Sequence, residues 1–497
     1  MMKKSLPVYD LVFAVIALAY LIYLFGRAWY IPVTHDEAAT SILLNGNNYV
    51  KLISYHYGYI SANNHVLNSL LAKFCSDITG GLSPLSIRAG NLLAAVVYLA
   101  AGYVLLQRFF QTNLLRVIGG VLWLANPYLA EFLALSRGYG MSAALEAATI
   151  CFGALYLSLP EDAPKRHTYL RLACISAMLV VWANFATLYF FLCFFVLLGW
   201  EMLRTRATSR RDLKTLLRSV LVLALLIVLP LTRIKSAGDF SWFGNAGFFK
   251  DTVQGFADCF LLGRHYFGPD TLLYLQWLLI LLFIASALAT LTLWWRSGGK
   301  VTPAVWLLGL FPGTVVVNVL ATLVTDSSWL STRTTLFFYP LVVCSVLGLF
   351  RLLEKRRPRL AWGLALPAAV LLSVHFFMNA NWAHTYEWRY DRDTYTILNY
   401  IEKTYQSENR TTPWSLHTYC LQHPSFQFHT RLMKSRYDGY VEEVRDTGCN
   451  IAEPVNKEVE FYYVPLDKSN PFQTEYDVVL KTSDGQRVLL RKKGSPQ

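Results

Sequence analysis

The stretch LVFAVIALAYLIYLFGRAWYIPVTHDEAAT, residues 11–40, passes from a long apolar run into a cluster of ionisable side chains. The apolar run ends near Gly26 and is long enough to cross the ~30 Å hydrocarbon core of a bilayer. His35, Asp36 and Glu37 follow shortly after its end. The stretch therefore predicts a first transmembrane helix that leads directly into an imidazole and two carboxylates.

The whole chain has the composition of a membrane protein. Apolar residues make up 54% of the 497 residues, charged residues only 15%, and the mean hydropathy is +0.35. A soluble protein of this length would carry about a quarter charged residues. We therefore expect a polytopic α-helical membrane protein with about eleven transmembrane helices in its first 380 residues. The expected spans lie near residues 8–26, 88–108, 114–133, 138–159, 169–184, 186–203, 218–234, 271–295, 302–324, 334–353 and 360–380.

The number of spans depends on residues 169–203. This run fits either two short spans that break at WAN (182–184) or one long helix. With the basic N-terminus in the cytoplasm, eleven spans place three basic loops on the cytoplasmic side, as the positive-inside rule requires. Eleven spans are therefore favoured, with the chain after residue 380 outside. The three loops are residues 164–167, 204–218 and 354–359.

The net charge of +13 reflects this orientation and does not indicate nucleic-acid binding. Residues 381–497 carry 15 Lys and Arg against 16 Asp and Glu, which leaves 30 against 16 for residues 1–380. The basic excess therefore lies in the membrane part, where it sets topology. Neither a phosphate-binding loop nor a dinucleotide fingerprint is present, which argues against ATP-driven transport by this chain.

Residues 381–497 predict a small extracytoplasmic α+β domain. Residues 392–406 have the pattern of a helix, residues 458–466 that of a strand, and residues 476–493 that of a hairpin turning at SDG (483–485). Cys420 and Cys449 lie in this domain and are able to pair if it is extracytoplasmic. The other six cysteines are scattered through apolar segments, and their spacing matches no metal site.

The first outer loop, residues 27–87, holds the first group of candidate site residues. Asp36 and Glu37 open an expected helix, and acidic residues in a first helical turn are ordinary caps, which is the alternative to a catalytic role. Amphipathic stretches near residues 36–53 and 64–76 predict two membrane-parallel helices. His56, Asn64 and His65 belong to the same loop.

Two arginines are expected at the same membrane face. Arg137 and Tyr139 lie in LSRGYGMSAALE at the outer end of the fourth span, and Arg333 lies in STRTTLFFYP at the start of the tenth. Two arginines and a carboxylate at one level suit a phosphate anion and a general base.

These motifs and their order resemble the GT-C superfamily of integral-membrane glycosyltransferases, in the branch of protein O-mannosyltransferases and aminoarabinose transferases. The resemblance covers the first span followed by an Asp-Glu pair, NNHVLNSLL in the first outer loop, SRGYGMSAAL at the fourth span, and the outer C-terminal domain. The chain departs from the branch in having His35 before the acidic pair and in lacking a proline after His65. These departures affect substrate identity more than reaction class.

The resemblance implies a function and a role for each candidate. Asp36 would be the general base on an acceptor hydroxyl, with Glu37 positioning it, in an inverting transfer at the outer face of the cytoplasmic membrane. The donor would be a sugar on a polyprenyl phosphate, and the acceptor a lipid, a glycan or a protein. No cofactor is required, although a metal held by His35, Asp36, His56 and His65 is an alternative. The substrate-binding residues would be His35, His56, Asn64, His65, Arg137, Tyr139 and Arg333.

Two other classes of protein remain as alternatives. A transporter or flippase of lipid-linked glycan predicts ionisable residues deep in the spans and two matching halves of the sequence. Neither feature is evident, because most charges lie at span ends and no internal repeat is visible. A non-enzymatic envelope protein predicts that Asp36→Asn has no effect.

Overall fold

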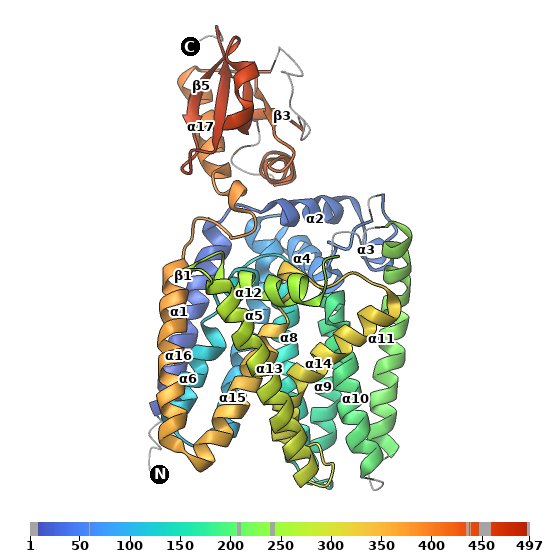
Figure 1. Cartoon of the computed structure of the whole chain (residues 1–497). Helices are drawn as coiled ribbons and strands as arrows, with labels where there is room; N and C mark the ends of the chain where they lie inside the picture. Colours follow the sequence, from blue (N-terminus) through green and yellow to red (C-terminus); the bar gives the residue numbers. More distant parts are fainter. Residues whose placement is uncertain are drawn as a thin grey trace, which may run out of the picture. The chain divides into compact units, whose positions relative to one another are not determined.

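The computed structural model describes residues 8–58, 60–205, 210–238, 244–433, 437, 439–446 and 459–494 (Figure 1). By its contacts the chain forms two units. The helical unit comprises residues 1–25, 53–68 and 90–380, and the mixed unit comprises residues 26–52, 69–89 and 381–497.

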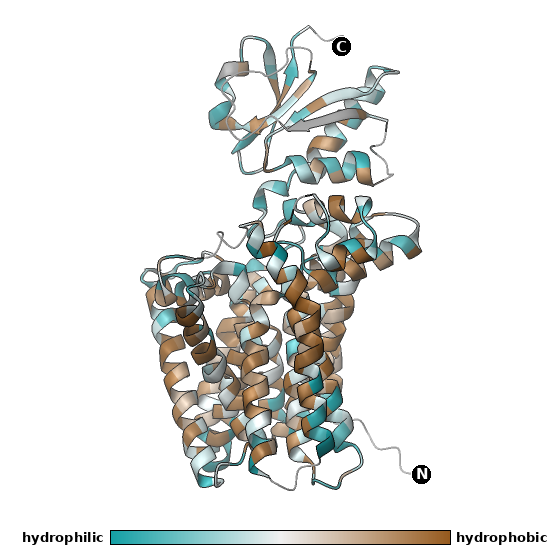
Figure 2. Ribbon diagram, turned by 90° about the vertical axis from the view of Figure 1, so that its right-hand side faces the viewer, coloured by the Kyte–Doolittle hydropathy of each residue, from teal (hydrophilic) through white to brown (hydrophobic). Residues whose placement is uncertain are grey.

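The helical unit is a bundle of long apolar helices, which appear predominantly brown in Figure 2. Among the described residues, eight helices are long and apolar enough to cross a membrane, and a ninth span results if the bent pair α6 and α7 is counted as one. The polytopic helical fold is therefore confirmed. Its long helices are α1 (Val8–Tyr30), α5 (Pro84–Phe109), α6 (Asn113–Leu124), α7 (Pro127–Ala134), α8 (Gly138–Ser158), α9 (Arg166–Ala183), α10 (Leu188–Arg204), α11 (Arg210–Ser236), α13 (Thr271–Arg296), α14 (Pro303–Thr325), α15 (Phe338–Arg356) and α16 (Pro358–Asn379).

Each predicted span overlaps a helix or, for residues 114–133, the pair α6 and α7, which is bent by 62°. Pro127 causes this bend because it has no N–H to continue the hydrogen bonds of α6. Asn126 then caps α7 by accepting a hydrogen bond from Leu129 N at 2.8 Å. The helices α9 and α15 are not among those that are long and apolar enough to cross a membrane. The count of eleven spans therefore stays a prediction.

Residues 169–203 form two helices, as one of the two readings predicted. The helix α9 ends at Ala183, and the buried Asn184 accepts a hydrogen bond from Ala186 N at 3.1 Å. This side chain competes with the helical hydrogen bonds and starts the 3₁₀ turn η1 (Phe185–Thr187) that leads into α10.

Two connections between long helices of the helical unit contain short elements. The connection between α11 and α13 contains η3 (Phe248–Val253), α12 (Gln254–Leu261) and β1 (Tyr266–Pro269). The connection between α14 and α15 contains the 3₁₀ turn η4 (Thr332–Thr335), and an antiparallel bridge between Gly244 and Trp329 joins the two connections.

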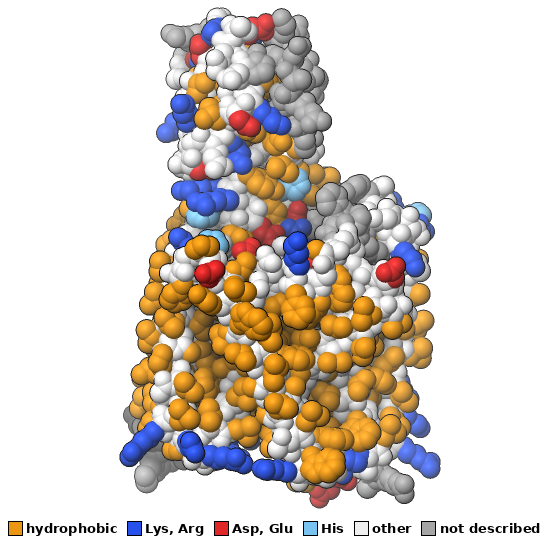
Figure 3. Space-filling model, viewed as in Figure 1, with side chains coloured by type: hydrophobic (Ala, Val, Ile, Leu, Met, Phe, Trp, Pro, Cys, Tyr) orange, Lys and Arg blue, Asp and Glu red, His pale blue; other side chains and the backbone are white. Residues whose placement is uncertain are grey.

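Basic side chains gather at one end of the helical bundle, below an apolar belt on its side (Figure 3). The end of α10 belongs to this end, and so does the start of α14, because Trp200 Nε1 of α10 donates to Gly299 O at 2.9 Å. The helix α14 starts at the basic end and runs through the bundle. The turn η4, which follows α14 and precedes α15, therefore lies at the opposite end.

The mixed unit combines helices of the first loop with a five-stranded sheet in the order β3-β2-β4-β6-β5. The pairs β2–β3 and β2–β4 are parallel, whereas β4–β6 and β5–β6 are antiparallel. Helix α17 packs on the sheet through Ile397 and Ile401, which contact a core that contains Trp414 and Phe461. Its elements are α2 (His35–Gly46), α3 (Tyr49–Ser54), α4 (Val66–Thr79), α17 (Thr394–Ser407), β2 (Trp414–Thr418), α18 (His423–Gln427), η6 (Phe428–Leu432), β3 (Val441–Asp446), β4 (Phe461–Pro465), β5 (Tyr476–Lys481) and β6 (Arg487–Lys492).

The α+β prediction for the C-terminal region is confirmed for the helix, the strand and the hairpin. Gly485 has a φ of +68°, which suits a glycine in the predicted turn. Strands β2 and β3 were not predicted. Cys420 is disulfide-bonded, whereas Cys449 lies outside the described residues. The other six cysteines, all among the described residues, form no disulfide bond.

Candidate functional site

In the mixed unit, Glu37 is held by Arg88, a residue that the sequence analysis did not select. Arg88 Nε and Nη2 donate to Glu37 Oε1 and Oε2 at 2.8 and 2.6 Å, and both side chains are fully buried. Glu37 also accepts from the backbone N–H and the hydroxyl of Thr34, which closes a capping box at the start of α2. The position of Glu37 therefore fits a positioning role.

The same arginine shapes the chain before α2. Its remaining N–H groups donate to the carbonyl oxygens of Ala28, Ile31 and Pro32 at 2.8–3.0 Å. Arg88 thus binds the end of the first helix, the connecting loop and the first turn of α2. Asp36 lies in this first turn of α2, so the contacts of Arg88 also fix the backbone that carries Asp36.

Asp36 is buried and lies near a second carboxyl group, that of Asp391. Asp391 Oδ2 accepts a hydrogen bond from His35 N at 2.7 Å. Burial raises the pKa of Asp391 well above its ordinary value, and the charge of Asp36 raises it further. Asp391 therefore keeps its proton to a higher pH than an ordinary aspartate.

His35 contacts residues of the C-terminal region. Its Nδ1 atom donates to Leu421 O at 2.8 Å, and its ring meets the Tyr390 ring edge to face at 6.4 Å. These contacts explain His35 as a link between α2 and that region.

Two further side chains fix Val33. Ser425 Oγ donates to Val33 O at 2.6 Å, and His429 Nε2 accepts from Val33 N at 3.3 Å. Burial, together with the nearby Arg88, lowers the pKa of His429 from 6.5 to about 3. His429 therefore stays neutral and able to accept this hydrogen bond.

We expect acid to destabilise the protein through His429. Since its pKa is lower when folded, the unfolded state binds the proton more tightly below pH 6.5, and stability falls as the pH falls from 6.5 towards 3. The slope for one such group approaches about 1.4 kcal/mol per pH unit. The acid shift is the fall in the thermal unfolding midpoint between pH 7 and pH 5, measured in detergent. It should be smaller in His429→Gln than in the wild type, and the glutamine amide oxygen can still accept from Val33 N.

The exposed His265 provides the matched control. His265→Gln should keep the acid shift of the wild type. Equal acid shifts in wild type and His429→Gln would contradict this account of His429.

In the helical unit, Arg137 and Arg333 lie on the same aromatic ring. Their guanidinium carbons are 5.9 and 6.0 Å from the centre of the Tyr139 ring. The ring of His65 meets Tyr139 edge to face at 4.5 Å. These four predicted residues therefore form one group, which we call the arginine cluster.

His65 is neutral in this group. Burial, followed by the charges of Arg137 and Arg333, lowers the pKa of His65 well below its ordinary value. Its buried Nε2 atom has no hydrogen-bond partner within the described part of the chain. A neutral imidazole beside two cations can donate or accept a hydrogen bond without adding a third positive charge.

The glycines of SRGYG allow this close packing. A Cβ atom at Gly138 would overlap the carbonyl oxygen of Ala183 and lie 2.6 Å from the ring of His65. A Cβ atom at Gly140 would overlap the backbone of Phe132. Both positions therefore need glycine for space.

Asparagines position the loop beside the cluster. Asn63 Oδ1 accepts a hydrogen bond from Arg137 Nη2, and Asn64 Nδ2 donates to the Tyr57 hydroxyl at 2.7 Å. Asn68 donates to Ser136 O at 3.1 Å, directly before Arg137. Asn64 is thus next to the cluster and fits a positioning role, whereas the structure leaves His56 exposed.

Asn63, Arg88, Asp391 and His429 were missed as site residues. Arg88 had a visible signal, because it is a charge at the first residue of a predicted span. No group of three or more His, Cys, Asp or Glu side chains that could hold a metal ion occurs among the described residues.

An apolar pocket lies in the helical unit, between elements that are near the turn that carries Arg333. It has a volume of about 420 Å³ and lies between η3, α12, α13, α14 and the start of α15. Phe256, Phe311 and Phe338 are among its lining residues, and α12 packs on η4. Two of the elements that line the pocket, η3 and α12, thus pack on the turn that carries Arg333.

No protein-family model matches the chain, and no curated protein matches it significantly in sequence. The structure of ArnT from Cupriavidus metallidurans in the apo state aligns with a TM-score of 0.52 over 97% of each chain, at 12% sequence identity. ArnT bound to undecaprenyl phosphate aligns with a TM-score of 0.53 over 98% of each chain, at 11% identity. An oligosaccharyltransferase from Archaeoglobus fulgidus in complex with Zn and sulfate gives a TM-score of 0.48, over 97% of this chain and 73% of that chain, at 11% identity.

The likeness to ArnT shows the fold. The predicted architecture, a bundle of membrane helices followed by a small α+β domain, is confirmed, and ArnT shares it.

Proposed function

We propose that the protein is a membrane glycosyltransferase that moves a sugar from a polyprenyl phosphate to a hydroxyl or phosphate group of a lipid, glycan or protein acceptor. The arginine cluster carries the proposal. Two guanidinium groups over one ring, beside a neutral imidazole, suit a phosphate that gains negative charge as the sugar leaves.

The apolar pocket supports a lipid-linked donor. A polyprenyl phosphate needs a charged site for its phosphate and an apolar surface for its chain. The apolar pocket is lined in part by η3 and α12, which pack on the turn η4 that carries Arg333. ArnT, which has the same fold, has a structure with undecaprenyl phosphate bound. The donor class therefore agrees with both the chemistry of the site and the fold.

Asp36 is proposed as the general base. Its carboxylate takes the proton of the acceptor hydroxyl while that oxygen attacks the anomeric carbon. The bond from this carbon to the phosphate oxygen breaks, and the phosphate leaves with the electron pair, stabilised by Arg137 and Arg333. The attack from the opposite face inverts the configuration, and Glu37 keeps Asp36 in place through Arg88.

The proposed location is a cytoplasmic membrane, with the arginine cluster at its outer face and the N-terminus in the cytoplasm. The basic end of the bundle supports this orientation, because Lys and Arg remain predominantly on the cytoplasmic side (Figure 3). The turn η4 with Arg333 belongs to the other end.

We expect Arg137→Gln and Arg333→Gln each to weaken the binding of undecaprenyl phosphate about 10- to 100-fold, the cost of one charged hydrogen bond. Purified protein in detergent would be titrated with undecaprenyl phosphate and, in parallel, with undecaprenol. Only the phosphate compound should bind more weakly to the variants than to the wild type.

Arg264→Gln is the matched control, because Arg264 is exposed in the loop after α12 and donates to Asn379. It should bind both lipids as the wild type does. The phosphate role is wrong if the cluster variants bind undecaprenyl phosphate with unchanged affinity. A flippase would show lipid translocation between leaflets without sugar transfer, which reconstituted vesicles would detect.

A further inference from the structure

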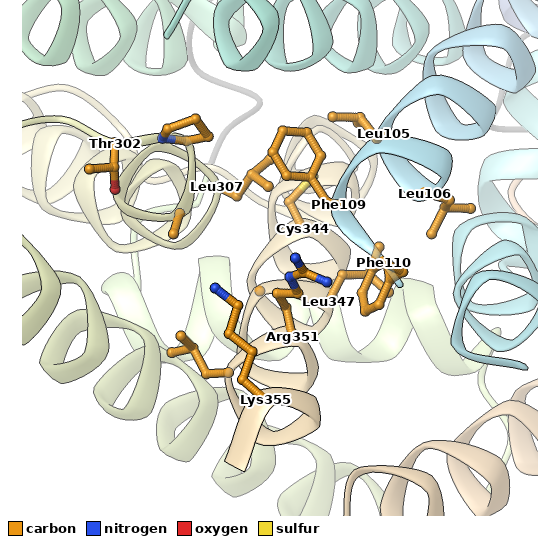
Figure 4. A pocket seen from close by; sticks show the side chains of 14 residues that line it. Leu105, Leu106, Phe109, Phe110, Thr302, Leu307, Cys344, Leu347, Arg351 and Lys355 are labelled. Atoms are coloured by element: carbon orange, nitrogen blue, oxygen red, sulfur yellow. The ribbon is translucent and has the colours of Figure 1, made fainter. Parts of the chain in front are cut away.

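The helical unit has a second apolar pocket, at the end of α14 and α15 that is distant from η4. It has a volume of about 350 Å³ and lies between α5, α14 and α15 (Figure 4). Its walls are formed by side chains such as Leu105, Phe109, Leu307 and Leu347. The function proposed above makes no use of this pocket.

Two cations, Arg351 and Lys355, lie at this pocket, one helical turn apart on α15, and Figure 4 shows both side chains directed towards it. No acidic side chain is among the residues that line it. The cavity is therefore apolar inside and positive at one side.

Arg351 is oriented by a fixed partner. Its Nη1 atom is 3.3 Å from Glu354 Oε2, and Glu354 Oε1 in turn accepts from Thr112 N and Oγ1 at 3.2 and 3.0 Å. Glu354 is buried and tied to the start of α6, so it holds the guanidinium in place. Lys355 makes no ion pair with the described part of the chain.

We propose that this pocket binds one anionic phospholipid from the leaflet at the basic end of the bundle. An acyl chain fills the cavity, and the lipid phosphate is bound by Arg351 and Lys355. A small soluble anion would leave the apolar cavity empty, and a zwitterionic lipid would bring a third cation to the two already present. An anionic lipid satisfies both the charge and the apolar surface.

The test measures lipid binding to the full chain. Native mass spectrometry of purified protein would compare phosphatidylglycerol with phosphatidylcholine of the same acyl chains. Wild type should bind phosphatidylglycerol at least about 10-fold more tightly, and Arg351→Gln/Lys355→Gln should lose this preference. Arg210→Gln/Lys214→Gln is the matched control, since these exposed residues have the same spacing on α11 at the same end.

A second variant tests the cavity itself. Ala304 lines the pocket, and Ala304→Phe should fill it and weaken both lipids without any change of charge. If Arg351→Gln/Lys355→Gln does not fold, Ala304→Phe still tests whether the pocket is the lipid-binding site.

Three results would overturn the proposal. If Arg210→Gln/Lys214→Gln lost the preference for phosphatidylglycerol as fully as Arg351→Gln/Lys355→Gln, the preference would reflect general attraction of anionic lipids to a basic surface. Unchanged phosphatidylglycerol binding in folded Arg351→Gln/Lys355→Gln or in Ala304→Phe would show that the pocket is not the site. If these pocket variants lost undecaprenyl phosphate binding but kept phosphatidylglycerol binding, the pocket would be assigned to the donor lipid instead.

Discussion

Asp36→Asn is expected to reduce the rate of sugar transfer by about 100- to 10,000-fold, the usual contribution of a general base. Asparagine has nearly the same shape, so the first turn of α2 and its link from Thr40 Oγ1 to Asp36 O should persist. The amide cannot take a proton from an acceptor hydroxyl. Binding of undecaprenyl phosphate should therefore stay near the wild-type value while kcat falls.

The neighbouring acid provides the control. Asp391 keeps its proton to much higher pH than an ordinary aspartate, and Asp391→Asn resembles that protonated form and can still accept from His35 N. This variant should retain most of the transfer activity. Release of sugar from a polyprenyl-phosphate donor, measured with purified proteins, compares the two.

Full activity in Asp36→Asn would remove Asp36 from the mechanism and revive its role as a helix cap. A large loss in Asp391→Asn, with activity retained in Asp36→Asn, would transfer the role of base to Asp391. The pair of variants therefore separates the two buried acids from each other.

The sequence was sufficient for features that depend on local pattern. The long apolar runs located the helices, and the polar residue Asn184 marked the break between α9 and α10. Alternation of apolar residues and the glycine at 485 located the C-terminal hairpin. Arg137 and Arg333 were predicted at one face from the direction of the spans, and the structure brings them onto the same ring.

Contacts between distant parts of the chain were beyond such patterns. His35 and Asp391 are 356 residues apart, and Val33 and His429 are 396 apart. No local periodicity encodes such a pair, because it depends on how whole elements pack. For the same reason β2 was missed, since Trp414 and Leu416 are buried in a sheet whose neighbouring strands lie elsewhere in the sequence.

The role of Glu37 changed most once its partner was known. As an acid beside Asp36 it was assigned together with the base, and capping was the alternative. The structure shows the cap and adds an arginine that uses both carboxylate oxygens. Capping and catalysis are therefore compatible here, because the capped turn is what positions Asp36.

Arg88→Met is accordingly expected to cost about 3–5 kcal/mol of stability, the range for breaking a buried ion pair by removing one partner. The change leaves the buried Glu37 charge without its cation and takes the donors away from Ala28 O, Ile31 O and Pro32 O. Lysine should not rescue the site, because an ammonium group cannot reproduce the two-pronged contact. Unfolding midpoints in detergent would measure the effect.

Lys73→Met is the matched control within the same unit, since Lys73 pairs with the half-exposed Asp77 at 3.3 Å and an exposed pair contributes at most about 1 kcal/mol. Glu37→Gln/Arg88→Met should be more stable than Arg88→Met alone, because the double variant no longer buries an unpaired carboxylate. A loss in Arg88→Met no larger than that in Lys73→Met would contradict the role of this ion pair. If the pair fixes the turn that carries Asp36, the double variant should recover stability without recovering transfer, because the carbonyl oxygens before α2 still lack their donor.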